Sequence, residues 1–445
     1  MLCRAALAAI PLLLILSCGR GDVEGTPDLN VVLVIIDTLR ADHIGYWGYD
    51  RGTTPCLDSL AAAGTAWMET QAQSSWTLPS VASILTGLTP REHGAGYAGG
   101  ELFGLSSSIR TLQGILHSRG WRSCGIFNVI FLNEDFGFHR GFDHFDCRGI
   151  TENSSTRRAG ETVDTAIQWL EGLAEDDKFL LVVHFYDPHI PYDPPPPYDV
   201  MFSDEGGTGG AGYSGLVMDT ILAVNRGEAS LSLHGLRMMT DLYDGEVAYT
   251  DGQIGRLFNY LTETGLSDRS LVIVTADHGE EFLEHSGLEH GRTLYQEVLH
   301  VPLILSGPGV PAGAIRTEPC AQVDILPTVL SYLGLEIPAG PSGIDLLGGS
   351  GAGSRDLPSS NLMWSAPAAS VRRDDRKIIW KAEDGGTEFY DLSEDPMEQH
   401  SIGVSGSAML QAVEYYWSTP PLADPPVVSF GDAEDNQLRD LGYLR

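Results

Sequence analysis

The stretch Asn30–Ile36 (NVVLVII) decides the fold of this chain of 445 residues. It is a continuous run of mostly β-branched apolar residues, the pattern of a strand that is buried on both faces of a sheet. Phe179–Phe185 (FLLVVHF), Leu271–Ala276 (LVIVTA) and Val301–Ser306 repeat this pattern. Between these strands lie helical patterns over residues 53–64, 79–85, 109–119, 162–174 and 238–264. One further strand is expected over residues 123–127. The alternation predicts an α/β fold with a large, mostly parallel sheet between layers of helices.

Side chains of the kind that bind metals stand at the carboxyl ends of three predicted strands. Asp37 follows the first, His184 and Asp187 end the second, and Asp277 and His278 follow the third. Because the carboxyl ends of parallel strands meet at one edge of a sheet, we expect these groups to lie together. An adjacent Asp and His can both bind one cation. Taken singly, each Asp also suits a hydrogen-bonded turn or a helix cap.

A hydroxyl group precedes the predicted helix at 79–85, in the segment Ser75–Ser80 (SWTLPS). A threonine in this position is most often a plain helix cap. Beside a divalent cation, however, a hydroxyl loses its proton near neutral pH, and the helix dipole favours the resulting anion. Thr77 is therefore a candidate nucleophile.

The charge of the chain limits its partners. With 60 acidic and 27 basic residues, the formal net charge is -33. Such a surface repels nucleic acid, so we expect no nucleic-acid partner. An anionic substrate would need a bound cation and a few local basic groups.

The N-terminus predicts export. Arg4 precedes the apolar run Ala5–Leu16, which is typical of a secretory signal and too short to span a membrane comfortably. The run ends at Ser17-Cys18 and resembles a bacterial lipobox, so we expect a lipid on Cys18 and a tether over residues 19–29. The predicted location is the bacterial cell envelope, anchored to a membrane at the periplasm or cell surface, with plain secretion as the alternative.

The remainder of the chain divides into two regions. We expect a catalytic domain over 30–345 and a C-terminal subdomain over 346–445, joined by a linker rich in Gly, Ser and Pro at 338–355. Residues 194–235 predict an irregular surface insertion. Residues 371–392 alternate in polarity and predict a small antiparallel unit that turns at Gly385-Gly386. The four cysteines beyond the signal are compatible with disulfides or with free thiols.

Five blocks of sequence resemble the sulfatase family of the alkaline-phosphatase superfamily, and they occur in the family's order. They are 30–55 (NVVLVIIDTLRADHIGYWGYDRGTTP), 74–93 (SSWTLPSVASILTGLTPREH), 183–192 (VHFYDPHIPY), 275–302 (TADHGEEFLEHSGLEHGRTLYQEVLHVP) and 388–398 (EFYDLSEDPME). The resemblance implies a large mixed sheet between helices and a C-terminal subdomain on a small antiparallel sheet. It also implies a metal-dependent hydrolase of anionic esters.

The resemblance assigns roles to individual residues. Asp37, Asp277 and His278 match the family's metal ligands, and Thr77, which would also touch the metal, matches the nucleophile. His189 and His290 match positions that bind the substrate and would take part in catalysis. His184, Asp187, Asn128 and Arg292 would contact the substrate or support the ligands.

Departures from the family pattern refine the expectation. Sulfatases convert a Cys or Ser to formylglycine, so Thr77 makes formylglycine unexpected and favours chemistry at phosphorus. Thr38 and His278 replace oxygen ligands, which favours zinc or manganese over calcium as the divalent metal, with calcium as the alternative. Val81 and Val129 replace polar residues that would contact the substrate.

The sequence therefore predicts a hydrolase or transferase that attacks an anionic ester through Thr77, with a phosphate or phosphonate ester favoured. One alternative is a sulfuric-ester hydrolase. Another is a family member that binds an anionic ligand without turnover, which the two valines suggest.

Overall fold

The computed structural model describes residues 29–147, 157–203, 214–348, 353–403 and 407–429. The predicted signal, Cys18 and the tether up to residue 28 lie outside this range, as does the Gly-rich stretch 206–213. Among the described residues, no helix combines the length and the apolar character that a membrane span requires.

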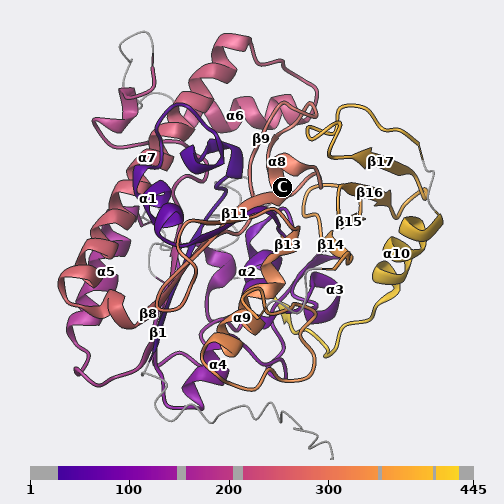
Figure 1. Ribbon diagram of the computed structural model, residues 1–445. Helices are drawn as coiled ribbons and strands as arrows, with labels where there is room; N and C mark the ends of the chain where they lie inside the picture. The colour runs from indigo at the N-terminus through magenta and orange to yellow at the C-terminus, as the bar shows by residue number, and fades with distance from the viewer. Residues whose placement is uncertain (1–28, 148–156, 204–213, 349–352, 404–406, 430–445) are drawn as a thin grey trace, which may run out of the picture.

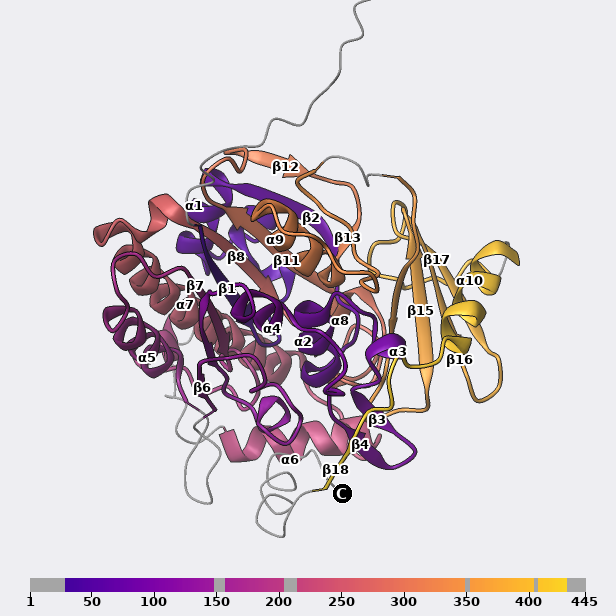
Figure 2. The ribbon, with the colours of Figure 1, turned by 90° about the horizontal axis from the view of Figure 1, so that it is seen from below.

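The main sheet is large, mixed and mostly parallel, as predicted (Figures 1 and 2). Its order is β12-β2-β11-β8-β1-β7-β5-β6, and β13 also pairs with β2. Only β11 runs antiparallel to its neighbours, β2 and β8, among the described pairs. The strands are β1 (Asn30–Ile36), β2 (Thr65–Gln71), β5 (Arg122–Ile126), β6 (His144–Asp146), β7 (Phe179–Phe185), β8 (Ser270–Ala276), β11 (His300–Ser306), β12 (Ala314–Arg316) and β13 (Cys320–Ala321).

Alternate residues of β1 enter two different cores, because successive side chains of a strand point to opposite faces. Val32 and Val34 pack with α1 (Pro55–Ala63), α5 (Ala159–Glu171) and α7 (Leu233–Glu263). Val31 and Leu33 pack with α2 (Thr77–Thr86), α4 (Leu112–His117) and α9 (Ile325–Tyr332). Figure 1 shows these two groups of helices on opposite sides of β1 and β8. Burial on both faces explains the apolar runs of the central strands.

A second, antiparallel sheet forms the C-terminal part, as predicted. It contains β14 (Leu357–Ser360), β15 (Ala368–Arg373), β16 (Arg376–Lys381) and β17 (Thr387–Asp391), and α10 (Ser407–Ser418) packs on it. The turn between β16 and β17 includes Gly385, whose φ of 71° suits glycine. The sheet begins earlier than the predicted unit at 371–392, because β14 pairs with β15.

The expectation of an irregular insertion at 194–235 was wrong over part of its length. α6 (Ser214–Asn225) is helical, and its Ile221 and Val224 are buried in the core. The Asn225 side chain also donates to the Leu288 carbonyl and accepts from the Leu288 amide, at 3.0 and 2.9 Å. These contacts fix α6 against the main domain.

The smaller elements are two short helices and the strands of two small sheets, one of three strands and one of two. They are α3 (Pro90–His93), α8 (Gln296–Leu299), β3 (Gly96–Ala98), β4 (Glu101–Phe103), β9 (Glu281–Phe282), β10 (Leu288–Glu289) and β18 (Val427–Val428). The helix expected at 109–119 is shorter, since Thr111 caps α4 by accepting from the Gly114 amide at 3.3 Å.

Candidate active site

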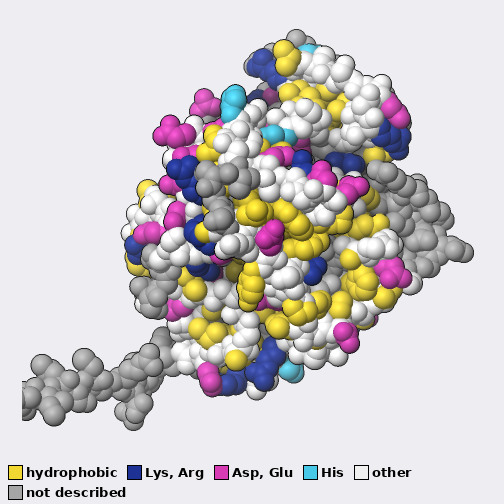
Figure 3. Space-filling model, turned by 90° about the vertical axis from the view of Figure 1, so that its right-hand side faces the viewer, with side chains coloured by type: hydrophobic (Ala, Val, Ile, Leu, Met, Phe, Trp, Pro, Cys, Tyr) yellow, Lys and Arg dark blue, Asp and Glu magenta, His cyan; other side chains and the backbone are white. Residues whose placement is uncertain are grey.

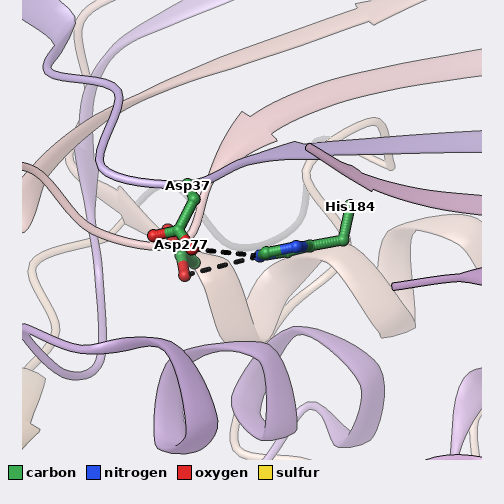
Figure 4. A group of neighbouring side chains, drawn as sticks. All are labelled: Asp37, His184 and Asp277. Atoms are coloured by element: carbon green, nitrogen blue, oxygen red, sulfur yellow. Dashed lines mark ion pairs between the residues drawn. The ribbon is translucent and has the colours of Figure 1, made fainter. Parts of the chain in front are cut away.

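Two carboxylates and an imidazole meet at the carboxyl edge of the main sheet (Figure 4). Asp37 follows β1, Asp277 follows β8, and His184 lies in β7, and these three strands are neighbours in the sheet. The Nε2 atom of His184 lies 3.6 Å from Oδ2 of Asp37 and 3.9 Å from Oδ2 of Asp277. One ligand atom from each residue lies within 4.8 Å of the others, and all three side chains are buried. The predicted convergence of the strand ends is what the structure shows.

The polar atoms of this group fit a bound cation. Both oxygens of Asp37, Oδ2 of Asp277 and both ring nitrogens of His184 are buried and have no hydrogen-bond partner among the described residues. Polar atoms left in this state are costly, and two adjacent carboxylates add repulsion. Burial and the nearby Asp277 charge accordingly raise the pKa of Asp37 well above its usual value. A divalent metal would satisfy these atoms and balance their charge, so the site fits the metal that the sequence predicts.

His278 adds a fourth candidate ligand. Its Nε2 atom lies 3.4 Å from Oδ1 of Asp37 and 3.5 Å from Oδ2 of Asp277. Its Nδ1 atom lies 2.9 Å from the Gly279 carbonyl, which can only accept, so Nδ1 carries the proton and Nε2 presents a lone pair. Burial lowers the pKa of His278 to about 4, which keeps the ring neutral as a ligand must be.

Backbone amides orient Asp277. The amides of Thr38 and His278 donate to its Oδ1 atom, at 3.3 and 2.8 Å, and this arrangement leaves Oδ2 facing the cluster. Burial opposes the ionisation of Asp277, but the neighbouring His278 and His184 lower its pKa to about 2. Asp277 is therefore ionised at neutral pH.

Thr77 stands at the start of α2, with its Oγ1 atom 3.4 Å from Nε2 of His278. The cap position of this helix is Trp76, so Thr77 is the first helical residue and not its cap. Its side chain is buried, with 2% exposed. The hydroxyl thus lies beside the candidate metal ligands at the positive end of a helix.

Two further histidines line the same site. The ring centroid of His290 lies 4.5 Å from that of His278 and 4.8 Å from that of His189. Burial lowers the pKa of both His189 and His290, and their mutual proximity lowers that of His189 further. The structure therefore brings the predicted catalytic residues Thr77, His189 and His290 to one place.

Glu280 is a site residue that sequence reasoning missed. Its Oε1 atom lies 3.0 Å from Nδ1 of His290, and its Oε2 atom accepts from the Tyr192 hydroxyl at 3.0 Å. Burial raises its pKa to about 8. Its position two residues after the ligand pair Asp277-His278 was the available signal.

Two predicted residues face away from the cluster. Asn128 donates to the backbone carbonyl of His184 and, at 3.0 Å, to the Thr162 hydroxyl, so it supports a candidate ligand from behind. Asp187 accepts from the Ala159 amide at 2.6 Å, at the start of α5. The structure does not bring Asp187 to the group formed by Asp37, His184 and Asp277.

Arg292 lies between the site and the C-terminal part. Its guanidinium group is 5.9 Å from the ring centroid of Trp364 and 3.6 Å from the Glu289 carboxylate. Val81, a residue of α2, and Val129, by contrast, are buried in the same apolar core. The two valines therefore have a packing role in this structure.

A loop after β14 supports the segment that carries Thr77. The Asn361 carbonyl accepts from Trp76 Nε1 at 2.7 Å and from the Ser74 hydroxyl at 3.0 Å. On the other side, the Gly291 amide donates to the Ser75 carbonyl at 2.8 Å. The segment that leads to Thr77 is thus held in place by two distant parts of the chain.

The four cysteines in the described range are free thiols. They are Cys56, Cys124, Cys147 and Cys320.

Comparisons with known proteins agree with this site. A family model described as "Sulfatase" matches residues 29–335. An arylsulfatase from Clostridium perfringens is 25% identical, over 87% of this chain and 92% of its own length. A multifunctional alkaline phosphatase superfamily protein from Trinickia caryophylli is 28% identical, over 72% of this chain and 76% of its own length.

Solved structures share the fold. One protein, solved in complex with its substrate D-glucosamine-2-N,6-O-disulfate, has a TM-score of 0.73 at 20% identity and covers 88% of this chain and 98% of its own. The phosphonate monoester hydrolase of Agrobacterium radiobacter has a TM-score of 0.67 at 22% identity, covering 88% and 94%. The matching family model, the geometry of the site and these relatives together show that the chain belongs to the sulfatase family.

Proposed function

We propose that this protein hydrolyses an anionic ester, with a phosphate or phosphonate ester favoured, through in-line attack by Thr77. The observation that carries the proposal is the buried Thr77 hydroxyl, 3.4 Å from Nε2 of His278 and beside the candidate metal group. Transfer to an acceptor other than water would use the same first step.

Asp37, Asp277, His184 and His278 would hold the metal. Two imidazoles and two carboxylates favour zinc or manganese over calcium, which prefers more oxygen ligands. When bound, the metal would supply positive charge that favours the ionised hydroxyl of Thr77 and offsets the charge of the substrate.

The protein's own groups would complete the reaction. The amides of Thr77 and Leu78 begin α2 and would stabilise developing negative charge on the ester oxygens, as helix N-termini do for bound anions. Thr77 Oγ1, after losing its proton to solvent, would form the new bond to phosphorus as the bond to the leaving oxygen breaks. His290 would donate its Nε2 proton to that oxygen and recover a proton at Nδ1 from Glu280, 3.0 Å away. Water would then attack phosphorus and break the bond to Oγ1, which releases the product and restores the hydroxyl.

The preference for phosphorus rests on Thr77. Formylglycine forms from Cys or Ser, so a threonine nucleophile suits direct attack on phosphorus. Among the relatives, the arylsulfatase and the phosphonate monoester hydrolase represent the two ester classes. A sulfuric-ester hydrolase is the second candidate, because the tetrahedral sulfate group would fit the same arrangement of donors.

Turnover measurements test the proposal. Metal-loaded protein would be assayed with bis-p-nitrophenyl phosphate, p-nitrophenyl phenylphosphonate and p-nitrophenyl sulfate. We expect turnover of the phosphorus esters that falls by at least about 10³-fold in Thr77→Ala. Thr86→Ala is the matched control, since Thr86 lies in the same helix and is equally buried, with 2% exposed.

Other outcomes would change the assignment. Turnover confined to the sulfate ester would refute the preference for phosphorus and support the sulfatase candidate. Absence of turnover of all three esters by protein with bound metal would favour the alternative of a ligand-binding family member. Undiminished turnover in Thr77→Ala would refute Thr77 as the nucleophile.

We also propose, from the sequence of the N-terminus, that the chain is exported and anchored by a lipid on Cys18. In a bacterial host, the full-length chain should fractionate with membranes, and Cys18→Ser should move it to the soluble exported fraction. Membrane association that is unchanged in Cys18→Ser would contradict the lipid anchor.

A further inference from the structure

A groove lies along α4, away from the candidate active site. Its main cavity has a volume of about 620 Å³ and a second cavity of about 390 Å³ adjoins it. The two are one groove, because both are lined by Ile109, Arg110, Ile115 and the Pro338-Ala339 segment. Each of the two cavities is within the range of volumes that small-molecule sites occupy.

Three arginines line the main cavity, namely Arg110, Arg119 and Arg140. None of them forms an ion pair with a residue that the structure describes. Many other arginines of the protein are paired with carboxylates, as Arg51 is with Asp241. In a chain with a net charge of -33, three unpaired guanidinium groups around one cavity form a local exception. Figure 3 shows Lys and Arg side chains gathered at the lower end of the molecule, the end where α4 lies in Figure 1.

Arg140 is held in place before any ligand binds. Its Nη2 atom donates to the carbonyls of Leu105 and Ser106, at 2.7 and 3.0 Å. Partial burial of its guanidinium group lowers its pKa. Glu336 is the one carboxylate among the residues lining the cavity, so the lining carries a surplus of positive charge.

The groove is separate from the catalytic centre. Helix α2 begins at Thr77 in the candidate active site, and Thr86 at its other end lines the second cavity. A helix of ten residues is about 15 Å long, so a small ester bound beside Thr77 would not reach the groove.

We propose that this groove binds an oxyanion, a sulfate or phosphate group, carried by a molecule of about the size of a disaccharide. Guanidinium groups pair with such anions through two parallel hydrogen bonds and are suited to this recognition. The hydroxyls of Ser107 and Ser118 and the apolar sides of Ile109 and Ile115 offer contacts for the body of the ligand. This site goes beyond the proposed function, since it needs no chemistry at Thr77.

Titration calorimetry with a heparin-derived disaccharide tests the proposal, with inorganic sulfate and phosphatidylglycerol vesicles as further probes. Wild-type protein should bind the disaccharide, and Arg110→Ser with Arg119→Ser should weaken binding by about tenfold or more. Both arginines are exposed, so the double variant should fold. Arg316→Ser, an exposed arginine on β12, is the matched control and should change nothing.

Glu336→Gln supplies a variant with the opposite expected sign. Removing this carboxylate should tighten binding, a gain that misfolding would not produce. Ester turnover should be unchanged in all these variants, which separates this site from the catalytic one. Tighter binding of the disaccharide than of sulfate would assign the site to a sugar ester. Equal binding of the two probes would assign it to the free anion. Both results support an oxyanion site. Equal affinity in the wild type and the double arginine variant, or binding of vesicles alone, would overturn the proposal.

Discussion

His93 makes the stability of the fold depend on pH. It is the last residue of α3 and is fully buried. Its Nδ1 atom accepts from the Ala95 amide at 3.0 Å, so the ring proton resides on Nε2, which lies 3.1 Å from the Pro79 carbonyl. A second proton would displace the Ala95 amide. Burial accordingly lowers the pKa of His93 from 6.5 to about 3.

The magnitude follows from this difference. Below pH 6.5 the unfolded chain binds a proton at His93 that the folded chain refuses, so stability falls as the pH falls. Each pH unit below the unfolded pKa costs about 1.4 kcal/mol, until the folded pKa is reached. Between pH 7.5 and pH 5 the free energy of unfolding falls by about 2 kcal/mol. This value is the same for any folded pKa below about 4.

Urea unfolding at the two pH values measures the effect. His93→Gln retains a donor toward Pro79 but does not titrate, so the wild type should lose about 2 kcal/mol more than this variant on going from pH 7.5 to pH 5. His234→Gln, which removes an exposed histidine, should behave as the wild type does. An identical pH dependence in the wild type and His93→Gln would refute the reasoning.

Two further predictions concern buried charges. Without metal, Asp37→Asn should be more stable than the wild type, because the substitution removes the repulsion from Asp277. With zinc or manganese at 100 times its Kd, the free energy of unfolding of the wild type should rise by about 2.7 kcal/mol, and that of the variant by much less. Thermal shifts of metal-stripped and reloaded protein measure this, and equal gains would exclude Asp37 as a ligand. Lys377 lies 2.8 Å from Glu398 with both side chains buried, so Lys377→Met should cost about 3–5 kcal/mol by leaving the carboxylate unpaired. In the same unfolding assay, Lys377→Met with Glu398→Leu should recover most of the loss, and a single variant as stable as the wild type would contradict the pairing.

Sequence patterns predicted the strands that are buried on both faces, because these strands are uniformly apolar. They did not reveal β2, whose sequence TAWMETQ contains polar residues at buried positions. Those polar groups find partners inside the fold: Thr65 donates to the Pro311 carbonyl, and Gln71 accepts from Gln296. A hydropathy pattern does not register a buried polar residue whose partner is remote in the sequence.

The candidate site was predictable where a residue's role depends on its place at a strand end. Asp37 and Asp277 follow this rule, and the structure brings them together with His184. Glu280 escaped prediction because its role depends on a contact with His290, which the turn between β9 and β10 creates. Asp187 shares a strand end with His184, yet its side chain turns to the start of α5. Asp187 lies two residues beyond the end of β7, where the alternation of a strand no longer fixes the direction of a side chain.

The loop after β14 has a consequence for building hybrid enzymes from this protein and its relatives. The family model ends at residue 335, but the bonds that hold Ser74 and Trp76 come from Asn361. The main-chain carbonyl of Asn361 accepts both bonds, and its side-chain Oδ1 atom also accepts from Trp76 at 3.2 Å and from the Tyr97 amide at 3.0 Å. A transplanted C-terminal part should therefore keep Asn at this position. It must also match one conformation, because Asn361 has a φ of 72°, which Asn and Gly adopt most readily. A donor with a β-branched residue at this position would lose the bonds to Trp76 even if its sheet folded correctly.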